Sequence, residues 1–429
     1  MFGFANFLLL ALFAAAVFDL FFALARGGGL RGALHGLWNT PHLLFGQQLA
    51  EWRLQLGRIL FAAGLAAYEI SVVFCNSMAR QNWAWVQGVM SPVLEWLAFL
   101  CFGAKILFGT RYTWRELLAG GALYFIARWV YFNSQNIWWI GIVVAVLAAK
   151  DVPLRRPLQV YFASGCAAMA VVLALHFAGI VAPDLTSERM GALRGTYGYG
   201  HPNTFGGLVF GLVLAYALLR AQKVRWVDCL LVFAVGVFLL VGPASRSAAL
   251  CTLALAVGLV FCRLRTGHSV PRWWPGTCAG MVGLTAAGSY LLPLLVIKVG
   301  PWNNDIGPAW LAKLDSLLTC RISLTWMAYR LLDVKIAGQV FNWPTVDNSF
   351  AFALFQFGPV VAALLGILFA AALLGHAKQG RRVEVCCLFA MLAYAYMEVQ
   401  PFHLTTNPTA LLLCGAVFAQ TSARWQKIE

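Results

Sequence analysis

The chain has 429 residues, of which 61% are hydrophobic and 11% are charged, and its net charge is +15. Its mean hydropathy is +0.76. Apolar runs of about 17–25 residues, the length that crosses a bilayer core, recur along the whole sequence. The basic residues lie in short clusters between these runs, which argues against nucleic acid as a partner. The sequence therefore predicts an all-α polytopic membrane protein with a single transmembrane domain over residues 1–429.

About 13 spans (12–14) are predicted along the chain. They lie near 4–25, 57–78, 89–109, 117–133, 136–149, 158–181, 203–219, 227–243, 247–262, 277–299, 348–373, 384–399 and 408–421. The first has no basic start and no small-residue cleavage site, so we expect a retained helix and not a signal peptide. The fourth and fifth are short and are predicted to form a tight pair that does not fully cross. The stretch 37–50 leaves the count in the N-terminal region open.

The sequence offers no signal for a metal or a cofactor. Its eleven cysteines lie mostly inside predicted spans, where they are expected to pack as small apolar residues. No zinc-like or disulfide-like spacing occurs, and there is no phosphate-binding loop or dinucleotide fingerprint. Asp305 and Asp315 lack the paired spacing common in magnesium sites. We therefore predict a site without metal or cofactor.

The distribution of basic residues predicts the orientation in the membrane. Twenty of the 31 fall in seven clusters that alternation of the spans places on one side. These clusters are 26–58, 111–115, 150–156, 220–225, 263–272, 378–382 and 424–427. The positive-inside rule makes that side cytoplasmic. Loops 182–202, 244–246, 300–347 and 400–407 are then expected to face outward.

One polar stretch interrupts the apolar chain, and it reads Arg194-Gly-Thr-Tyr-Gly-Tyr-Gly200-His201-Pro202-Asn203-Thr204-Phe-Gly-Gly207. Its glycines permit backbone conformations that other residues avoid. Pro202 suits the first turn of a helix, where its missing N–H is no loss. The stretch predicts a tight loop that presents polar side chains at the start of the next span. The alternative is an ordinary helix start with incidental polar residues.

The large outer loop, 300–347, is predicted to contain an amphipathic helix, because leucines recur at helical spacing between 311 and 332. Arg194, Arg246 and Arg321 all fall on the outward side. Guanidinium groups that converge there would bind phosphate through planar, bidentate donors. The alternative for each arginine is a side chain that reaches the membrane interface.

Four stretches resemble, in order and spacing, the motifs of Wzy-type polysaccharide polymerases in the O-antigen polymerase and ligase superfamily. The first is 194–207, whose His-Pro-Asn form is typical of members that make capsular polysaccharide or exopolysaccharide. The second is Ser245-Arg-Ser247. The third and fourth are the segments that open and close the large outer loop, 314–321 and 347–350 with Gly358, and the last outer loop, 398–407, agrees as well. The likeness covers about residues 90–421.

The resemblance implies a GT-C-like, metal-independent glycosyltransferase in the bacterial cytoplasmic membrane, with its active site on the extracytoplasmic side. Its substrate would be an oligosaccharide repeat unit on undecaprenyl pyrophosphate, polymerised into capsule, exopolysaccharide or O-antigen. A chain-length regulator and a flippase are candidate assembly partners beside the lipid bilayer. An O-antigen ligase-type transferase is the alternative within the class, and a transporter or flippase of lipid-linked saccharide is the alternative outside it.

The resemblance also assigns roles to individual residues. Arg194, Arg246 and Arg321 would bind pyrophosphate, with Asn203 and Asn348 as further substrate-binding residues. Asp347 stands where ligase relatives carry a histidine, which favours a polymerase. The general base stays open between Asp347, His201 and Glu398, in that order. The simplest alternative for Asp347 is a cap on the following span.

Overall fold

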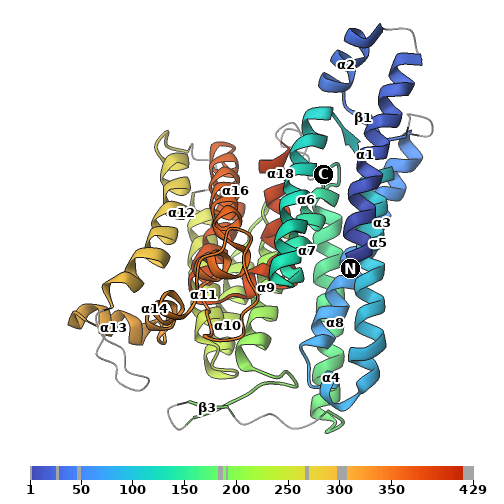
Figure 1. The fold of residues 1–429 in the computed structure, drawn as a ribbon. Coiled ribbons are helices and arrows are strands. Elements are labelled where there is room, and N and C mark those ends of the chain that lie inside the picture. Colours follow the sequence, from blue (N-terminus) through green and yellow to red (C-terminus); the bar gives the residue numbers. More distant parts are fainter. Residues whose placement is uncertain are drawn as a thin grey trace.

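The computed structural model describes residues 2–25, 29–45, 50–181, 187–189, 192–265, 270–296 and 307–418. Helices dominate these ranges, and Figure 1 shows them as a bundle whose long helices run in roughly one direction. The predicted cluster 424–427 and Asp305 lie outside the described residues, as do parts of the outer loops 182–202 and 300–347.

The α-helices follow one another along the whole chain. They are α1 (Phe2–Ala25), α2 (Gly29–Asn39), α3 (Ala50–Cys75), α4 (Ala79–Asn82), α5 (Ser91–Phe108), α6 (Trp114–Ser134), α7 (Ile137–Ala148), α8 (Arg155–Phe177), α9 (Pro202–Leu219), α10 (Trp226–Val241), α11 (Arg246–Leu264), α12 (Trp274–Leu291), α13 (Ala309–Leu317), α14 (Arg321–Leu331), α15 (Ser349–Phe352), α16 (Pro359–Lys378), α17 (Arg382–Met397) and α18 (Cys414–Val417). Short π-helical turns η1 (Val86–Met90) and η3 (Ala353–Phe357) and 3-10 turns η2 (Leu292–Leu295), η4 (Gln400–Phe402) and η5 (Pro408–Leu413) adjoin them.

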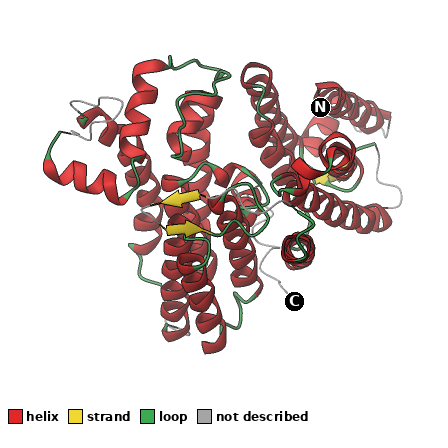
Figure 2. Cartoon of the chain, turned by 90° about the horizontal axis from the view of Figure 1, so that it is seen from below, coloured by secondary structure: helices red, strands yellow, loops and turns green. Residues whose placement is uncertain are grey.

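Two short antiparallel strand pairs occur among the described residues. Strand β1 (His42–Leu43) pairs with β2 (Arg111–Tyr112), and β3 (Ser187–Arg189) pairs with β4 (Ala192–Arg194), which places Ser187 opposite Arg194. In Figure 1, β3 and α4 lie at the lower end of the bundle and α2 at the upper end. Figure 2, which views the molecule from below, shows a two-stranded hairpin lying across helix ends.

Eight helical segments of the described chain are long and apolar enough to cross a membrane. They are Asn6–Ala25, Glu51–Cys75, Val86–Phe108, Arg155–Phe177, Pro202–Leu219, Arg246–Leu264, Trp274–Leu295 and Pro359–Lys378. Many large apolar side chains on them face outward, such as Phe13 on α1 and Val257 on α11. The chain is therefore an all-α polytopic membrane protein.

Close packing between helices rests on small residues, as is usual in membranes. A Cβ atom at Gly57 of α3 would lie 2.8 Å from the Cα atom of Gly109, and one at Gly64 would lie 2.9 Å from the ring of Phe102. The α3 and α5 backbones approach each other because these positions have no side chain.

The predicted spans differ from the observed helices mainly in the C-terminal third. The span 348–373 is not continuous, because Gly358 has φ of 87° and the membrane helix α16 begins only at Pro359. Residues 408–418 form a 3-10 turn followed by the short α18, and positions 419–421 of that predicted span lie outside the described residues. The helix α7 has 12 residues and rises only about 18 Å. That length is too short to cross the bilayer core, whereas α6, the other member of the predicted pair, has 21 residues and is long enough by length alone.

The amphipathic helix expected in the large loop is two helices, α13 and α14. They are separated at Thr319 and Cys320, which have φ of 56° and 65°. The buried Asp315 stabilises the turn, because its Oδ1 atom accepts hydrogen bonds from the backbone N–H groups of Ile322 (2.7 Å) and Ser323 (3.1 Å). Asp315 thus fixes the first turn of α14.

Candidate functional site

The polar stretch 194–207 forms a loop and a helix start, as its sequence predicts. Tyr197 and Gly198 have φ of 52° and 81°, and the Gly198 carbonyl accepts the Met78 N–H at 2.8 Å, which ties the loop to the N-cap of α4. Helix α9 begins at Pro202, and His201 is its N-cap. The loop thereby places Asn203 in the first turn of α9.

Arg194 and Asn203 meet at this helix start. The Nη2 atom of Arg194 donates to Asn203 Oδ1 at 2.9 Å and to the Ala244 carbonyl at 3.2 Å. Arg194 is buried, although its charge would favour water. Its contacts join the β4 strand to α9 and to the hairpin before α11.

The start of α11 packs directly on α9 because residue 206 is a glycine. A Cβ atom at Gly206 would lie 2.3 Å from Ser245 Oγ and 2.6 Å from Ser245 Cβ. This close approach brings Ser247 of α11 to the same centre as Asn203. The glycine at 206 is therefore a packing requirement of the site.

Arg321 is the first residue of α14, and the protein supplies acceptors to all three of its guanidinium nitrogens. Nε donates to the Met397 carbonyl at 3.0 Å, and Nη1 donates to both the carbonyl and the hydroxyl of Thr319. Nη2 lies 3.1 Å from Glu398 Oε1 and 3.4 Å from Asp347 Oδ2. Arg321 thus holds two carboxylates beside each other.

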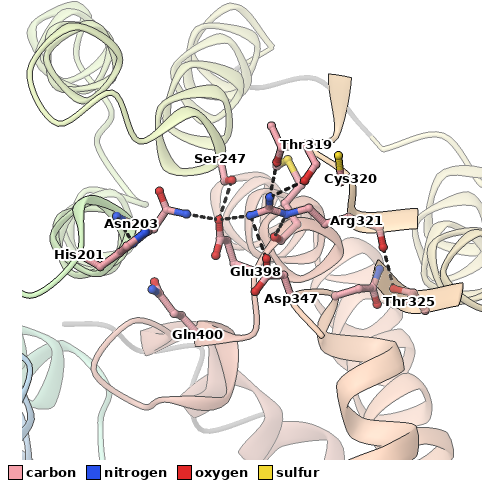
Figure 3. Close-up of polar contacts among 12 residues, drawn as sticks. His201, Asn203, Ser247, Thr319, Cys320, Arg321, Thr325, Asp347, Glu398 and Gln400 are labelled. Carbon is pink, nitrogen blue, oxygen red and sulfur yellow. Dashed lines mark hydrogen bonds and ion pairs between the residues drawn. The ribbon is translucent and has the colours of Figure 1, made fainter. Parts of the chain in front are cut away.

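Glu398, just beyond the end of α17, is the centre of the network (Figure 3). Its Oε1 atom accepts hydrogen bonds from Asn203 Nδ2 at 2.9 Å, Ser247 Oγ at 2.8 Å and Arg321 Nη2 at 3.1 Å. Its Oε2 atom has no hydrogen-bond partner among the residues that the structure describes. Four segments distant in sequence thus meet at one carboxylate.

The two carboxylates differ in exposure and therefore in chemistry. The Glu398 side chain is 6% exposed, whereas that of Asp347 is 25% exposed. Burial raises the pKa of Glu398 to about 7, the charge of Arg321 opposes this rise, and the nearby charge of Asp347 adds to it. Glu398 can therefore change protonation near neutral pH, while Asp347 is the carboxylate that a bound molecule can reach.

The structure separates the roles of Asp347 and Asn348. Asn348 is the N-cap of α15 and accepts the Ala351 N–H at 3.0 Å, so Asp347 is not the cap. The amide nitrogen of Asn348 donates to Ser289 Oγ (2.9 Å) and to the Tyr396 carbonyl (3.0 Å). The side-chain amide of Asn348 therefore helps to hold the fold through both its oxygen and its nitrogen, and its contact with substrate stays a prediction.

His201 and Arg246 lie at the margin of the network. His201 is exposed, and its Nδ1 atom accepts the Asn203 N–H at 3.1 Å, which orders the first turn of α9. Arg246 is exposed at the first position of α11, next to Ser247. The structure therefore brings Arg194, Asn203, Arg321, Asp347 and Glu398 together, with these two residues beside them.

Gln400 is a neighbour that sequence reasoning did not single out. Its Oε1 atom accepts a hydrogen bond from Tyr394 Oη at 2.8 Å, and a Cβ atom at Gly207 would lie 2.0 Å from it. The paired glycines at 206 and 207 were the available signal, since each marks a close approach of a neighbouring segment. Among the described residues, no three His, Cys, Asp or Glu side chains group as metal ligands.

Comparisons with known proteins place no further constraint on this site. No protein-family model, no curated protein and no solved structure matches the chain significantly.

Proposed function

We propose that the chain is an extracytoplasmic glycosyltransferase of the bacterial cytoplasmic membrane that polymerises lipid-linked oligosaccharide repeat units into capsular polysaccharide, exopolysaccharide or O-antigen. The substrate in this proposal carries its glycan on undecaprenyl pyrophosphate. The proposal includes a GT-C-like arrangement of about 13 spans with the network around Glu398 on the outward side, and it uses no metal or cofactor.

One observation carries the proposal: the stretches that resemble the polymerase motifs supply the groups that meet at Glu398. Asn203 comes from the first, Ser247 from the second, Arg321 from the third, Asp347 from the fourth and Glu398 from the last outer loop. Nothing in the sequence separation of these stretches requires them to meet. Their convergence on a buried ion-pair network is what a shared chemical task would produce.

The proposed reaction needs a base, a leaving group and charge stabilisation. The oxygen of an acceptor hydroxyl bonds to the anomeric carbon of the donor sugar, and the bond from that carbon to the pyrophosphate oxygen breaks. The electron pair leaves with the lipid pyrophosphate, and the hydroxyl proton passes to a carboxylate. We assign this base to Asp347, because it is the more exposed of the two carboxylates on Arg321.

The arginines then have different tasks. All three nitrogens of Arg321 contact protein acceptors, so Arg321 is a positioning residue for Asp347 and Glu398. Arg246 is the most exposed of the three arginines and Arg194 is buried behind Asn203. We therefore assign the pyrophosphate first to Arg246, with Arg194 adding positive charge near the leaving group.

The test is reconstitution of the purified protein with a lipid-linked repeat unit and separation of the glycan products by size. A ladder of products that remain on the lipid pyrophosphate supports a polymerase. Transfer only to a different acceptor would indicate a ligase. Movement of the intact lipid between leaflets without any new glycosidic bond would indicate a transporter and contradict the proposal.

A further inference from the structure

An apolar groove lies between α12 and α16, outside the network around Glu398. Its volume is about 700 Å³, within the range of small-molecule sites. Ala279, Gly283 and Ala286 line it from α12, and Ala362, Gly366 and Ala370 line it from α16. These positions recur every three or four residues, so each helix turns one continuous face toward the groove. Small side chains on both faces leave the space open.

The groove has one polar end, and that end adjoins the candidate site. Tyr290 and Tyr329 line it there. Tyr290 follows Ser289, which accepts a hydrogen bond from Asn348, the neighbour of Asp347. Tyr329 lies on α14, the helix that begins with Arg321. The tyrosine end of the groove is therefore linked to Asp347 through Ser289 and Asn348, and to Arg321 through helix α14.

The length of the groove matches one leaflet of a bilayer. Ala279 and Tyr290 lie eleven residues apart on α12, which is about 16 Å along a helix axis. The hydrocarbon core of a bilayer is about 30 Å thick. An amphiphile with its polar head at the tyrosine end would place its apolar tail along a single leaflet. A chain that crossed both leaflets would extend well past Ala279.

We propose that this groove binds the polyprenyl tail of the lipid-linked substrate and thereby sets the position of its pyrophosphate at the site. This inference rests on the proposed function for the identity of the lipid. The groove holds the first isoprene units next to Tyr290 and Tyr329, and the rest of the tail continues toward the bilayer centre. Because the groove is apolar, it recognises the tail through burial and shape.

The glycines of the two helices offer a matched set of variants. A Cβ atom at Gly283 or at Gly366 meets no atom within 4 Å, so we expect a leucine there to extend into the groove. Gly280 on α12 and Gly375 on α16 also have no atom within 4 Å and do not line the groove. Leucine at any of the four raises helix propensity by a similar amount, so the controls differ from the test variants only in location.

The experiment is photo-crosslinking in lipid nanodiscs with a polyprenyl pyrophosphate that carries a diazirine on its second isoprene unit. We expect labelled peptides from α12, from α16 and from the part of α14 that carries Tyr329. Labelling should fall roughly tenfold in Gly283→Leu and Gly366→Leu, the scale of discrimination typical of apolar pockets, and should be unchanged in Gly280→Leu and Gly375→Leu. Labelling on other helices, or equal labelling of all four variants, would overturn the inference.

Two further arms separate the occupant from the function. A phospholipid that carries the same diazirine should label the groove weakly, and labelling as strong as that by the polyprenyl probe would make the groove an ordinary lipid site and overturn the inference. In the polymerisation assay, Gly283→Leu should raise the KM for a long-tailed donor and leave that for a short-tailed donor unchanged. Groove labelling by the polyprenyl probe without any polymer from the wild-type protein would support the groove and contradict the polymerase.

Discussion

Arg321→Lys tests whether the guanidinium group holds the network together. The arginine makes five polar contacts from three nitrogens, on Met397, Thr319, Glu398 and Asp347. A lysine ammonium has three donors on one nitrogen and cannot reach Thr319 and both carboxylates at once. At least two contacts are lost. A hydrogen bond to a charged group contributes about 1.5–3 kcal/mol, so we expect a loss of about 3–6 kcal/mol in the free energy of unfolding.

The matched control is Arg330→Lys on the same helix, where the arginine is exposed and lies over the ring of Trp326. Both variants are unfolded by a denaturing detergent in mixed micelles, with helix content by circular dichroism as the readout. Arg330→Lys should stay within about 0.5 kcal/mol of the wild type. If Arg321→Lys does the same, the contacts of Arg321 do not hold this region and the account of the network is wrong.

Three further predictions address protonation, packing and orientation. Burial raises the pKa of Glu398 to about 7, so the carboxylate becomes protonated as the pH falls through 7 and its pairing with Arg321 weakens. The rate of polymer formation should therefore fall below pH 7, and Glu398→Gln should remove that inflection. A wild-type rate that stays constant from pH 6 to 8 would contradict this role of Glu398. Gly206→Ala places a methyl group 2.3 Å from Ser245 Oγ and should lower the free energy of unfolding by about 1–3 kcal/mol. Gly200→Ala is the control, because a Cβ atom there meets no atom within 4 Å and the free energy of unfolding should not fall. Equal stability of the two variants would contradict the close packing of α9 on α11. All eleven cysteines lie in the described chain, and only Cys320 is exposed. A membrane-impermeant maleimide should label Cys320 in intact cells and should not label the Cys320→Ser variant. Labelling that occurs only after lysis would mean the opposite orientation in the membrane.

The helix start at Pro202 could be predicted because local chemistry dictates it. Proline is favoured at the first helical position, and α9 begins at Pro202. The break between α13 and α14 had no such signal. Thr319 and Cys320 adopt left-handed backbone conformations without a glycine, and Asp315 stabilises the turn from several residues away.

The centre of the site could not be ranked from the sequence. The sequence places Glu398 after Asp347 and His201 as a candidate base. Its central position comes from contacts with three segments that lie 77 to 195 residues away, which sequence spacing does not reveal. Asn348 is a second example. Its position next to Asp347 suggests a substrate-binding residue, whereas its hydrogen bond from the Ala351 N–H makes it the N-cap of α15. Sequence spacing indicates candidate residues for such a site, and tertiary packing decides which of them are reachable.

Reconstitution of wild-type protein, Asp347→Asn and Glu398→Gln with a lipid-linked repeat unit tests whether the chain polymerises glycan and whether Asp347 is the base. The wild-type protein should produce a ladder of lipid-linked glycans. Asp347→Asn should stay folded, bind the lipid-linked unit and form polymer about 10²–10⁴-fold more slowly, the usual contribution of a general base. A wild-type ladder that Asp347→Asn also makes at full rate, while Glu398→Gln makes none, would move the base to Glu398. The absence of any ladder from a folded wild-type protein that binds the lipid-linked unit would contradict the polymerase itself.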